Sequence, residues 1–201
     1  MDTRTDVASS QPCPTCGDTD DRGRRIVFVA HCILNANAKV EGLALYEGVH
    51  PLVTRLAKNG VGIVQMRCAE MEMCGMKRWG QTREQYENPA FVAHCNRLAR
   101  QTAASIEEYL RCGYEVLGIV GIDGSPTCGV DSSASGRWGG EFASGEALLS
   151  AMESVTSSSV PGVHMRALMD VCAARKIRFT ALDESLADHG VERVLSDMGL
   201  E

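Results

Sequence analysis

The chain has 201 residues, a formal net charge of −6, and apolar and charged shares of 44% and 23%, which is the size and composition of one globular domain. This acidic balance argues against a nucleic-acid polymer as a partner, because proteins that bind phosphate backbones usually present a basic face. No apolar run is long enough to span a bilayer, and the polar N-terminus lacks the apolar stretch of a secretory signal, so we expect a cytoplasmic protein without a membrane partner.

The first 24 residues are polar, with almost no apolar side chains, and predict a disordered tail. One α/β domain is expected at residues 25–201. The tail contains Cys13 and Cys16, which look like half of a zinc ribbon. Because a closed zinc site needs a second pair of ligands and the tail offers none, we assign these two cysteines no role.

Beyond the tail, apolar runs alternate with stretches of helical spacing. Short β-branched runs predict buried strands, and apolar residues three or four positions apart predict helices. The expected strands are 26–30, 61–66, 114–122 and 177–182, and the expected helices are 50–58, 88–112, 161–176 and 186–198. Residues 131–160 are rich in Ser and Gly and predict a long loop or lid, with a short helix at 145–152. The alternation predicts a Rossmann-like parallel sheet with helices on both faces, in a single domain.

Nine cysteines are a high and odd number for this chain. Without a secretory signal we expect reduced thiols, and clustered reduced thiols are typical of metal or redox chemistry. Cys95, Cys112 and Cys172 lie inside helical patterns, where we expect them to be buried as small apolar side chains. The cysteines outside these patterns are better candidates for chemistry.

Three cysteines, Cys32, Cys68 and Cys128, each follow the end of an expected strand. Because the carboxyl ends of parallel strands meet at one edge of a sheet, we expect the three thiols on the same rim. Converging thiolates are ligands for zinc or for an iron–sulfur cluster. Three thiolates leave one metal position open, which is typical of catalytic rather than structural metal. The spacing alone does not choose between zinc and iron.

Four further polar residues lie in these loops. Glu70 stands two residues after Cys68, on the same side of an extended segment, and is a candidate for moving protons or for capping a backbone amide. Ser125 is a candidate for bonding a substrate or for capping a turn. His31 and Asn35 flank Cys32 and are candidate substrate-binding residues, although a histidine there can equally bond a nearby backbone group.

The three loops resemble those of the thiouracil desulfidase family, over about residues 26–135. The motifs that carry the resemblance are Cys32-Ile33-Leu34-Asn35, Cys68-Ala69-Glu70 and Ser125-Pro126-Thr127-Cys128-Gly129. A subgroup of related desulfidases is similar also in its His-Cys-Ile-Leu-Asn opening and in a Gly-x-x-Arg stretch, here Gly75-Met76-Lys77-Arg78. Three ordered motifs in matching strand context are a fairly specific signal.

The resemblance implies a [4Fe-4S] cluster with Cys32, Cys68 and Cys128 as its protein ligands. It also implies catalytic roles for Glu70 and Ser125, in an enzyme that removes sulfur from a small thiolated base or a similar thiocarbonyl compound without net redox change. The sequence departs from the family pattern in three places: Ala69 replaces a proline, Ala38 replaces a further cysteine of the thiouracil branch, and the third strand ends in Gly121-Ile122-Asp123 instead of a basic stretch. The identity of the substrate therefore does not follow.

Two other functions are compatible with the same three thiols. One is a non-enzymatic iron–sulfur or zinc protein that senses oxidants, and such a sensor needs neither Glu70 nor Ser125. The other is an enzyme that inserts sulfur, because sulfide bound at an open iron is common to both directions of the reaction.

Overall fold

The computed structural model describes residues 20–186 and 188–201, so most of the expected tail, with Cys13 and Cys16, lies outside the described part. The centre is a four-stranded sheet in which neighbouring strands run parallel. Its strands, in their order across the sheet, are β2 (Gly62–Gln65), β1 (Arg25–Val29), β3 (Glu115–Ile122) and β6 (Phe179–Leu182). The predicted α/β class is confirmed, and all four expected strands form close to their predicted positions.

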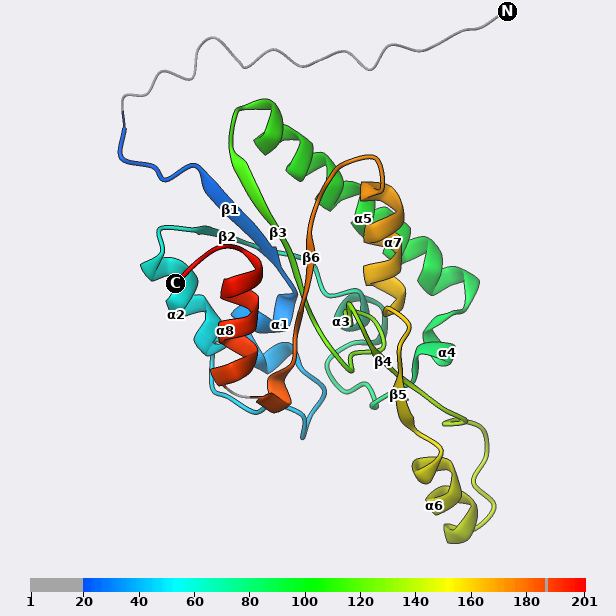
Figure 1. Cartoon of the computed structure of the whole chain (residues 1–201). Helices are drawn as coiled ribbons and strands as arrows, with labels where there is room; N and C mark the ends of the chain where they lie inside the picture. Colours follow the sequence, from blue (N-terminus) through cyan, green and yellow to red (C-terminus); the bar gives the residue numbers. More distant parts are fainter. Residues whose placement is uncertain (1–19, 187) are drawn as a thin grey trace, which may run out of the picture.

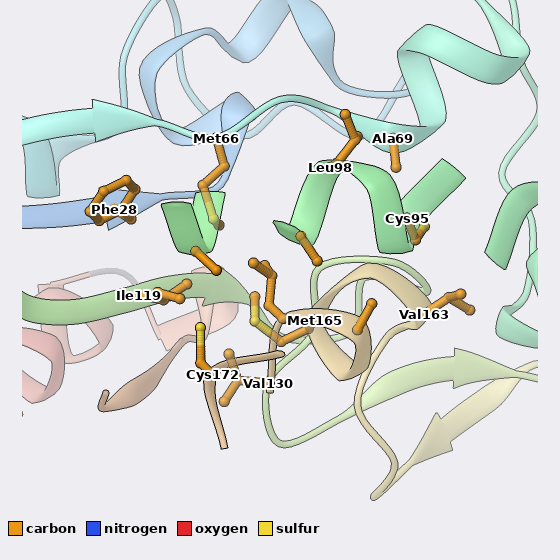
Figure 2. Packing of buried hydrophobic residues seen from close by; sticks show 14 of the residues in the cluster. Phe28, Met66, Ala69, Cys95, Leu98, Ile119, Val130, Val163, Met165 and Cys172 are labelled. Carbon is orange, nitrogen blue, oxygen red and sulfur yellow. The ribbon is translucent and has the colours of Figure 1, made fainter. Parts of the chain in front are cut away.

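One face of the sheet is covered by α5 (Pro89–Arg111) and α7 (Val163–Cys172) (Figure 1). Figure 2 shows the apolar core beneath them, where Phe28 from the sheet and Leu98 and Met165 from the two helices lie close together. The expected inner stripe of the long helix, with Cys95, faces this core because its apolar residues repeat at helical spacing.

The other face is covered by α2 (Pro51–Lys58) and α8 (Asp188–Asp197). A second apolar cluster there includes Val29, Leu56 and Val194, all fully buried. β1, β3 and β6 are mostly buried, whereas the edge strand β2 is exposed at Gly62 and Gln65. Buried strands read as continuous apolar runs, which is why the sequence locates them well. Within the described residues, no helix has the length and apolar content needed to cross a membrane.

Short helices fill the connections at the carboxyl end of the sheet. They are α1 (His31–Leu34), the 3-10 helix η1 (Ala36–Ala38), α3 (Ala69–Cys74), α4 (Arg83–Tyr86) and the 3-10 helix η2 (Glu184–Leu186). Such single-turn helices have too few residues for a periodic pattern, so the sequence does not predict them.

Residues 133–158 form an arm that is more ordered than the expected loop. β4 (Ser133–Ser135) pairs antiparallel with β5 (Thr156–Ser158), and α6 (Gly145–Glu153) lies between them. The arm carries α6 away from the sheet (Figure 1). The short helix was expected at 145–152, whereas the two Ser-rich strands have no apolar alternation from which to predict them.

Two other differences concern the ends of helices. α7 ends at Cys172 rather than at residue 176, and the backbone N–H of Arg175 donates to the Cys172 carbonyl oxygen (2.8 Å) in the turn that leads to β6. Cys112 is half-buried rather than buried, because it stands at the C-terminal end of α5 where the inner stripe has ended.

The last residues of the expected tail contact the sheet. The backbone N–H of Glu115, the first residue of β3, donates to the Arg24 carbonyl oxygen (2.8 Å), and the Arg22 guanidinium donates to the Tyr114 hydroxyl (2.9 Å). Residues 20–24 thus lie against the amino end of β3 without forming a helix or strand.

Candidate functional site

Three thiols line one cavity at the carboxyl end of the sheet. Cys32 follows β1, Cys68 follows β2 and Cys128 follows β3, and these three strands are neighbours. All three cysteines line a cavity of about 550 Å³. The structure therefore brings together the cysteines that the sequence places at strand ends.

The loop with Cys32 is fixed through its backbone. The Ala30 N–H donates to the Val120 carbonyl oxygen (2.9 Å), which ties the end of β1 to β3, and the Tyr46 hydroxyl donates to the Cys32 carbonyl oxygen (2.9 Å). Burial raises the pKa of the Cys32 thiol to about 12, and the positive charge of Lys39 opposes that shift.

Cys68 is the N-cap of α3. Its sulfur accepts a hydrogen bond from the backbone N–H of Met71 (3.4 Å). Burial raises the pKa of the Cys68 thiol, and this N–H partly offsets the increase because it favours the thiolate.

The loop with Cys128 is held by the start of α7. The first backbone N–H groups of a helix have no partner within the helix, and here they donate to carbonyl oxygens of the loop. The bonds run from Gly162, Val163, His164 and Met165 to Pro126, Thr127 and Gly129, each at 3.0 Å. The loop therefore caps α7, and α7 fixes the loop.

Gly129 and Gly162 stand where this loop and helix leave no room for a side chain. A Cβ at Gly129 would lie 1.8 Å from the Ser132 carbonyl oxygen, and one at Gly162 would lie 2.4 Å from the Thr127 carbonyl carbon. We expect Gly129→Ala and Gly162→Ala each to lower the free energy of unfolding by roughly 1–3 kcal/mol, the usual cost of overpacking. Urea unfolding measures this loss. Gly145→Ala is the control, since nothing lies within 4 Å of its Cβ, and equal losses in all three variants would contradict the assignment.

The three thiols suit a positively charged metal centre. Burial raises the pKa of the Cys128 thiol well above its ordinary value, and negative charge on Cys68 and Cys32 raises it further. A metal centre between the thiols would offset both effects, because thiolates are its ligands. The donor set therefore fits an iron–sulfur cluster.

A single metal ion and a cluster require different arrangements of their protein ligands. Across residues 20–186 and 188–201, no three His, Cys, Asp or Glu side chains form a group that could hold one ion. In a cluster the thiolates bind different irons, so its ligands need not meet at one point.

Glu70 lies buried on the cavity wall and joins two neighbouring segments. Arg78 donates through Nε to Oε2 of Glu70 (3.0 Å), and the Thr127 hydroxyl donates to Oε1 (2.6 Å). The side chains of Arg78 and Glu70 are only 3% and 9% exposed. Since Thr127 precedes Cys128, Glu70 links the loops of the second and third thiols.

Each of the three side-chain nitrogens of Arg78 donates a hydrogen bond. Besides its bond to Glu70, it donates to the carbonyl oxygens of Gly75 (3.2 Å) and Ala38 (2.7 Å). Such additional hydrogen bonds offset part of the cost of burying an ion pair. Arg78 therefore positions the carboxylate, which explains the arginine of the Gly-x-x-Arg stretch in physical terms.

Ser125 lines the cavity and also caps its own turn. Its hydroxyl oxygen accepts hydrogen bonds from the backbone N–H groups of Cys128 (3.0 Å) and Thr127 (3.4 Å). Of the two roles left open by the sequence, turn capping is the one with hydrogen bonds in the structure. Ser125 Oγ also lies 3.5 Å from Thr127 Oγ1, which can accept the Ser125 proton because Thr127 donates its own proton to Glu70.

The side chains of His31 and Asn35 contact nearby backbone groups, and their expected role in substrate binding stays a prediction. Nδ1 of His31 lies 3.3 Å from the Met66 carbonyl oxygen, which is the backbone contact named as the alternative. The Asn35 side chain accepts from the backbone N–H of Asn37 (3.1 Å) and caps η1. Neither residue lines the cavity wall. Their neighbour Cys32 does so because α1 turns the chain immediately after the strand.

An ion pair that the sequence does not predict also lines the cavity. Lys39 pairs with Glu184, and the Lys39 ammonium lies 5.1 Å from the centre of the Tyr46 ring. The side chains of the pair are 9% and 11% exposed. Nothing in the sequence points to this contact, because the two residues are 145 positions apart and neither belongs to a motif.

Comparison with known proteins identifies one archaeal relative at significant similarity. The uncharacterized protein MJ0003 of Methanocaldococcus jannaschii is 36% identical over 110 residues, which cover 54% of this chain and 70% of that protein. No family model matches the chain, and no solved structure matches it.

Proposed function

The chain belongs to the same family as protein MJ0003 of Methanocaldococcus jannaschii, and we propose that it is a cytoplasmic iron–sulfur enzyme that removes sulfur from a small thiolated base or a similar thiocarbonyl compound. The observation that carries the proposal is the cavity lined by Cys32, Cys68 and Cys128 together with a buried carboxylate, Glu70. A cluster-binding sensor needs the thiols but not the carboxylate. The similarity to the desulfidase motifs supports the same function.

The reaction is a hydrolysis without net redox change. Water adds its oxygen to the thiocarbonyl carbon, the carbon–sulfur bond breaks, and the sulfur leaves with both protons of the water as hydrogen sulfide or as hydrosulfide and a proton. Cys32, Cys68 and Cys128 would hold the cluster. When bound through three thiolates, a cluster supplies an iron free of protein ligands that acts as a Lewis acid on the thiocarbonyl group.

Glu70 is the group of the chain suited to move the protons. Each of its oxygens accepts one hydrogen bond, from Thr127 or from Arg78, and an ionised carboxylate oxygen can accept another. The free lone pairs would take a proton from the attacking water and return it to the departing sulfur. Arg78 and Thr127 hold the carboxylate in place, and Ser125, which lines the same cavity, would bond the substrate through its hydroxyl.

The proposal is tested on anaerobically purified protein. We expect a brown preparation with iron and acid-labile sulfide in equal amounts, and sulfide release from at least one member of a panel of thiolated pyrimidines, thiolated purines and small thioamides. A colourless protein with one equivalent of zinc would support the sensor function instead. A loaded protein that releases no sulfide from any compound of the panel would count against the desulfidase.

A further inference from the structure

The cavity has a polar part and an apolar part that come from different segments. The thiols, Glu70 and Ser125 lie at the carboxyl ends of the strands. The apolar part is formed by Val40 and Leu43 from one loop and by Trp138, Met152 and Val155 from the arm. A ligand whose reacting end lies at the thiols would therefore extend along apolar side chains.

Several apolar side chains of this part of the cavity are exposed among the described residues. No residue of α6 is buried, and Met152, which lines the cavity, is 54% exposed. Leu43, from the other segment, is 59% exposed. Apolar side chains at the mouth of a cavity are typical of ligand sites, where a few polar groups fix the orientation of a largely apolar ligand.

Trp138 is the one aromatic residue among the described residues of the cavity wall. The two residues before it are anchored: the Arg137 N–H donates to the Ser154 hydroxyl (2.9 Å), and the Gly136 N–H donates to Glu84 of α4 (3.3 Å). The two sides of the arm approach so closely there that a Cβ at Gly136 would lie 2.6 Å from the Ser154 carbonyl oxygen. The Trp138 ring itself packs against the Phe142 ring, with the ring centroids 5.4 Å apart. These contacts support the indole before a ligand arrives, which lowers the entropy lost on binding.

We propose that Trp138 determines substrate specificity by stacking on a planar heterocycle with an apolar substituent, whose thiocarbonyl end lies at the thiols. This inference rests on the proposed function and names its substrate class. The cavity of about 550 Å³ would hold the cluster at the thiols and leave space for a ligand beyond it. The surplus space is bounded by Leu43 and Met152, which favours an alkyl or aryl group over a sugar or phosphate.

The two tryptophans of the chain allow a direct test. Trp79 is 76% exposed and does not line the cavity, so Trp79→Phe leaves Trp138 as the only indole reporter. The probe is 6-propyluracil, an oxygen analogue that cannot release sulfide, with uracil as the unsubstituted comparison. We expect 6-propyluracil to quench the fluorescence of Trp79→Phe and to leave that of Trp138→Phe unchanged.

Affinity measured by calorimetry on the anaerobically purified protein completes the test. We expect Trp138→Ala to bind 6-propyluracil roughly 5- to 150-fold more weakly, the usual range for loss of one base–aromatic stacking contact, and Trp138→Phe to restore most of the affinity. Trp79→Ala, the matched control, should bind as the parent does. Uracil should bind more weakly than 6-propyluracil to the parent protein.

The outcomes separate this inference from the proposed function. Unchanged affinity in Trp138→Ala would overturn the role of Trp138, even in a protein that releases sulfide. Binding that depends on Trp138, in a protein that releases no sulfide from any thiolated compound, would support the heterocycle site and contradict the desulfidase. Equal affinity for uracil and 6-propyluracil would contradict the inference that the substrate carries an apolar substituent.

Discussion

Replacement of Cys32, Cys68 or Cys128 by alanine is expected to abolish stable cluster binding. The physical reason is that a site with three thiolates has no spare ligand, and the part of the cavity wall that the structure describes holds no further cysteine. Iron and acid-labile sulfide, measured on protein purified without oxygen, should fall from near four equivalents of each per chain to trace amounts, if the proposed [4Fe-4S] cluster is correct.

The matched controls are Cys95→Ala and Cys172→Ala. Both thiols are buried in the core formed by α5 and α7, away from the cavity wall (Figure 2). Their replacement removes one sulfur atom from a packed core and should lower stability slightly while leaving the metal content unchanged. The assignment fails if all five variants retain the same iron and sulfide.

The position of the thiols follows from the sequence because it depends only on local pattern and on a general rule of parallel sheets. Each strand is marked by a continuous apolar run, and each of the three cysteines comes within a few residues of such a run. The carboxyl ends of neighbouring parallel strands must meet at one edge. No knowledge of side-chain packing is needed for that step.

The groups that orient Glu70 depend instead on packing between segments distant in the chain. Thr127 reaches Glu70 across 57 positions, and Arg78 bonds Ala38 across 40. The same limit applies to the pair of Lys39 and Glu184. Sequence periodicity reports which face of an element is buried, not which polar groups meet once it is buried.

The prediction for His31 and Asn35 shows a second limit. Their nearness to Cys32 in sequence suggested nearness to substrate. A helical turn begins at His31, however, and successive residues of a helix point in different directions. Cys32 therefore lines the cavity while His31 faces the Met66 carbonyl oxygen. Trp138 lines the cavity although no motif predicts it, because the arm that carries it has no periodic pattern.

Glu70→Gln is expected to retain a full cluster and to lose turnover by a factor of about 10²–10⁴, the usual contribution of general acid–base catalysis. Glutamine keeps the size of the side chain, and its single oxygen can still accept from Arg78 while its NH2 group donates to the Thr127 hydroxyl, but it cannot take a proton from water. The measurement is sulfide release in a single anaerobic turnover, after absorbance has shown equal cluster content in variant and parent.

Glu70→Gln should also lower the stability of the protein, because of its effect on Arg78. Arg78 is 3% exposed and its charge is paired with Glu70, so Glu70→Gln leaves a buried guanidinium without an anionic partner. Breaking a buried ion pair from one side costs roughly 3–5 kcal/mol of stability, and urea unfolding should detect this loss. Glu72→Gln is the matched control on the same helix, because Glu72 pairs with the exposed Arg67 and should affect neither quantity strongly.

The two readouts separate chemistry from support of the fold. If Glu70 served only to hold Arg78 and the Cys128 loop, Glu70→Gln would lower stability and cluster content together, and the loaded fraction would turn over normally. Normal sulfide release per loaded cluster would therefore exclude Glu70 as the proton carrier, and Ser125 or water would take that role. Slow sulfide release from a fully loaded variant would assign the proton transfer to Glu70. A loss of stability, measured separately by unfolding without substrate, would show that Glu70 also pairs with Arg78 in the fold.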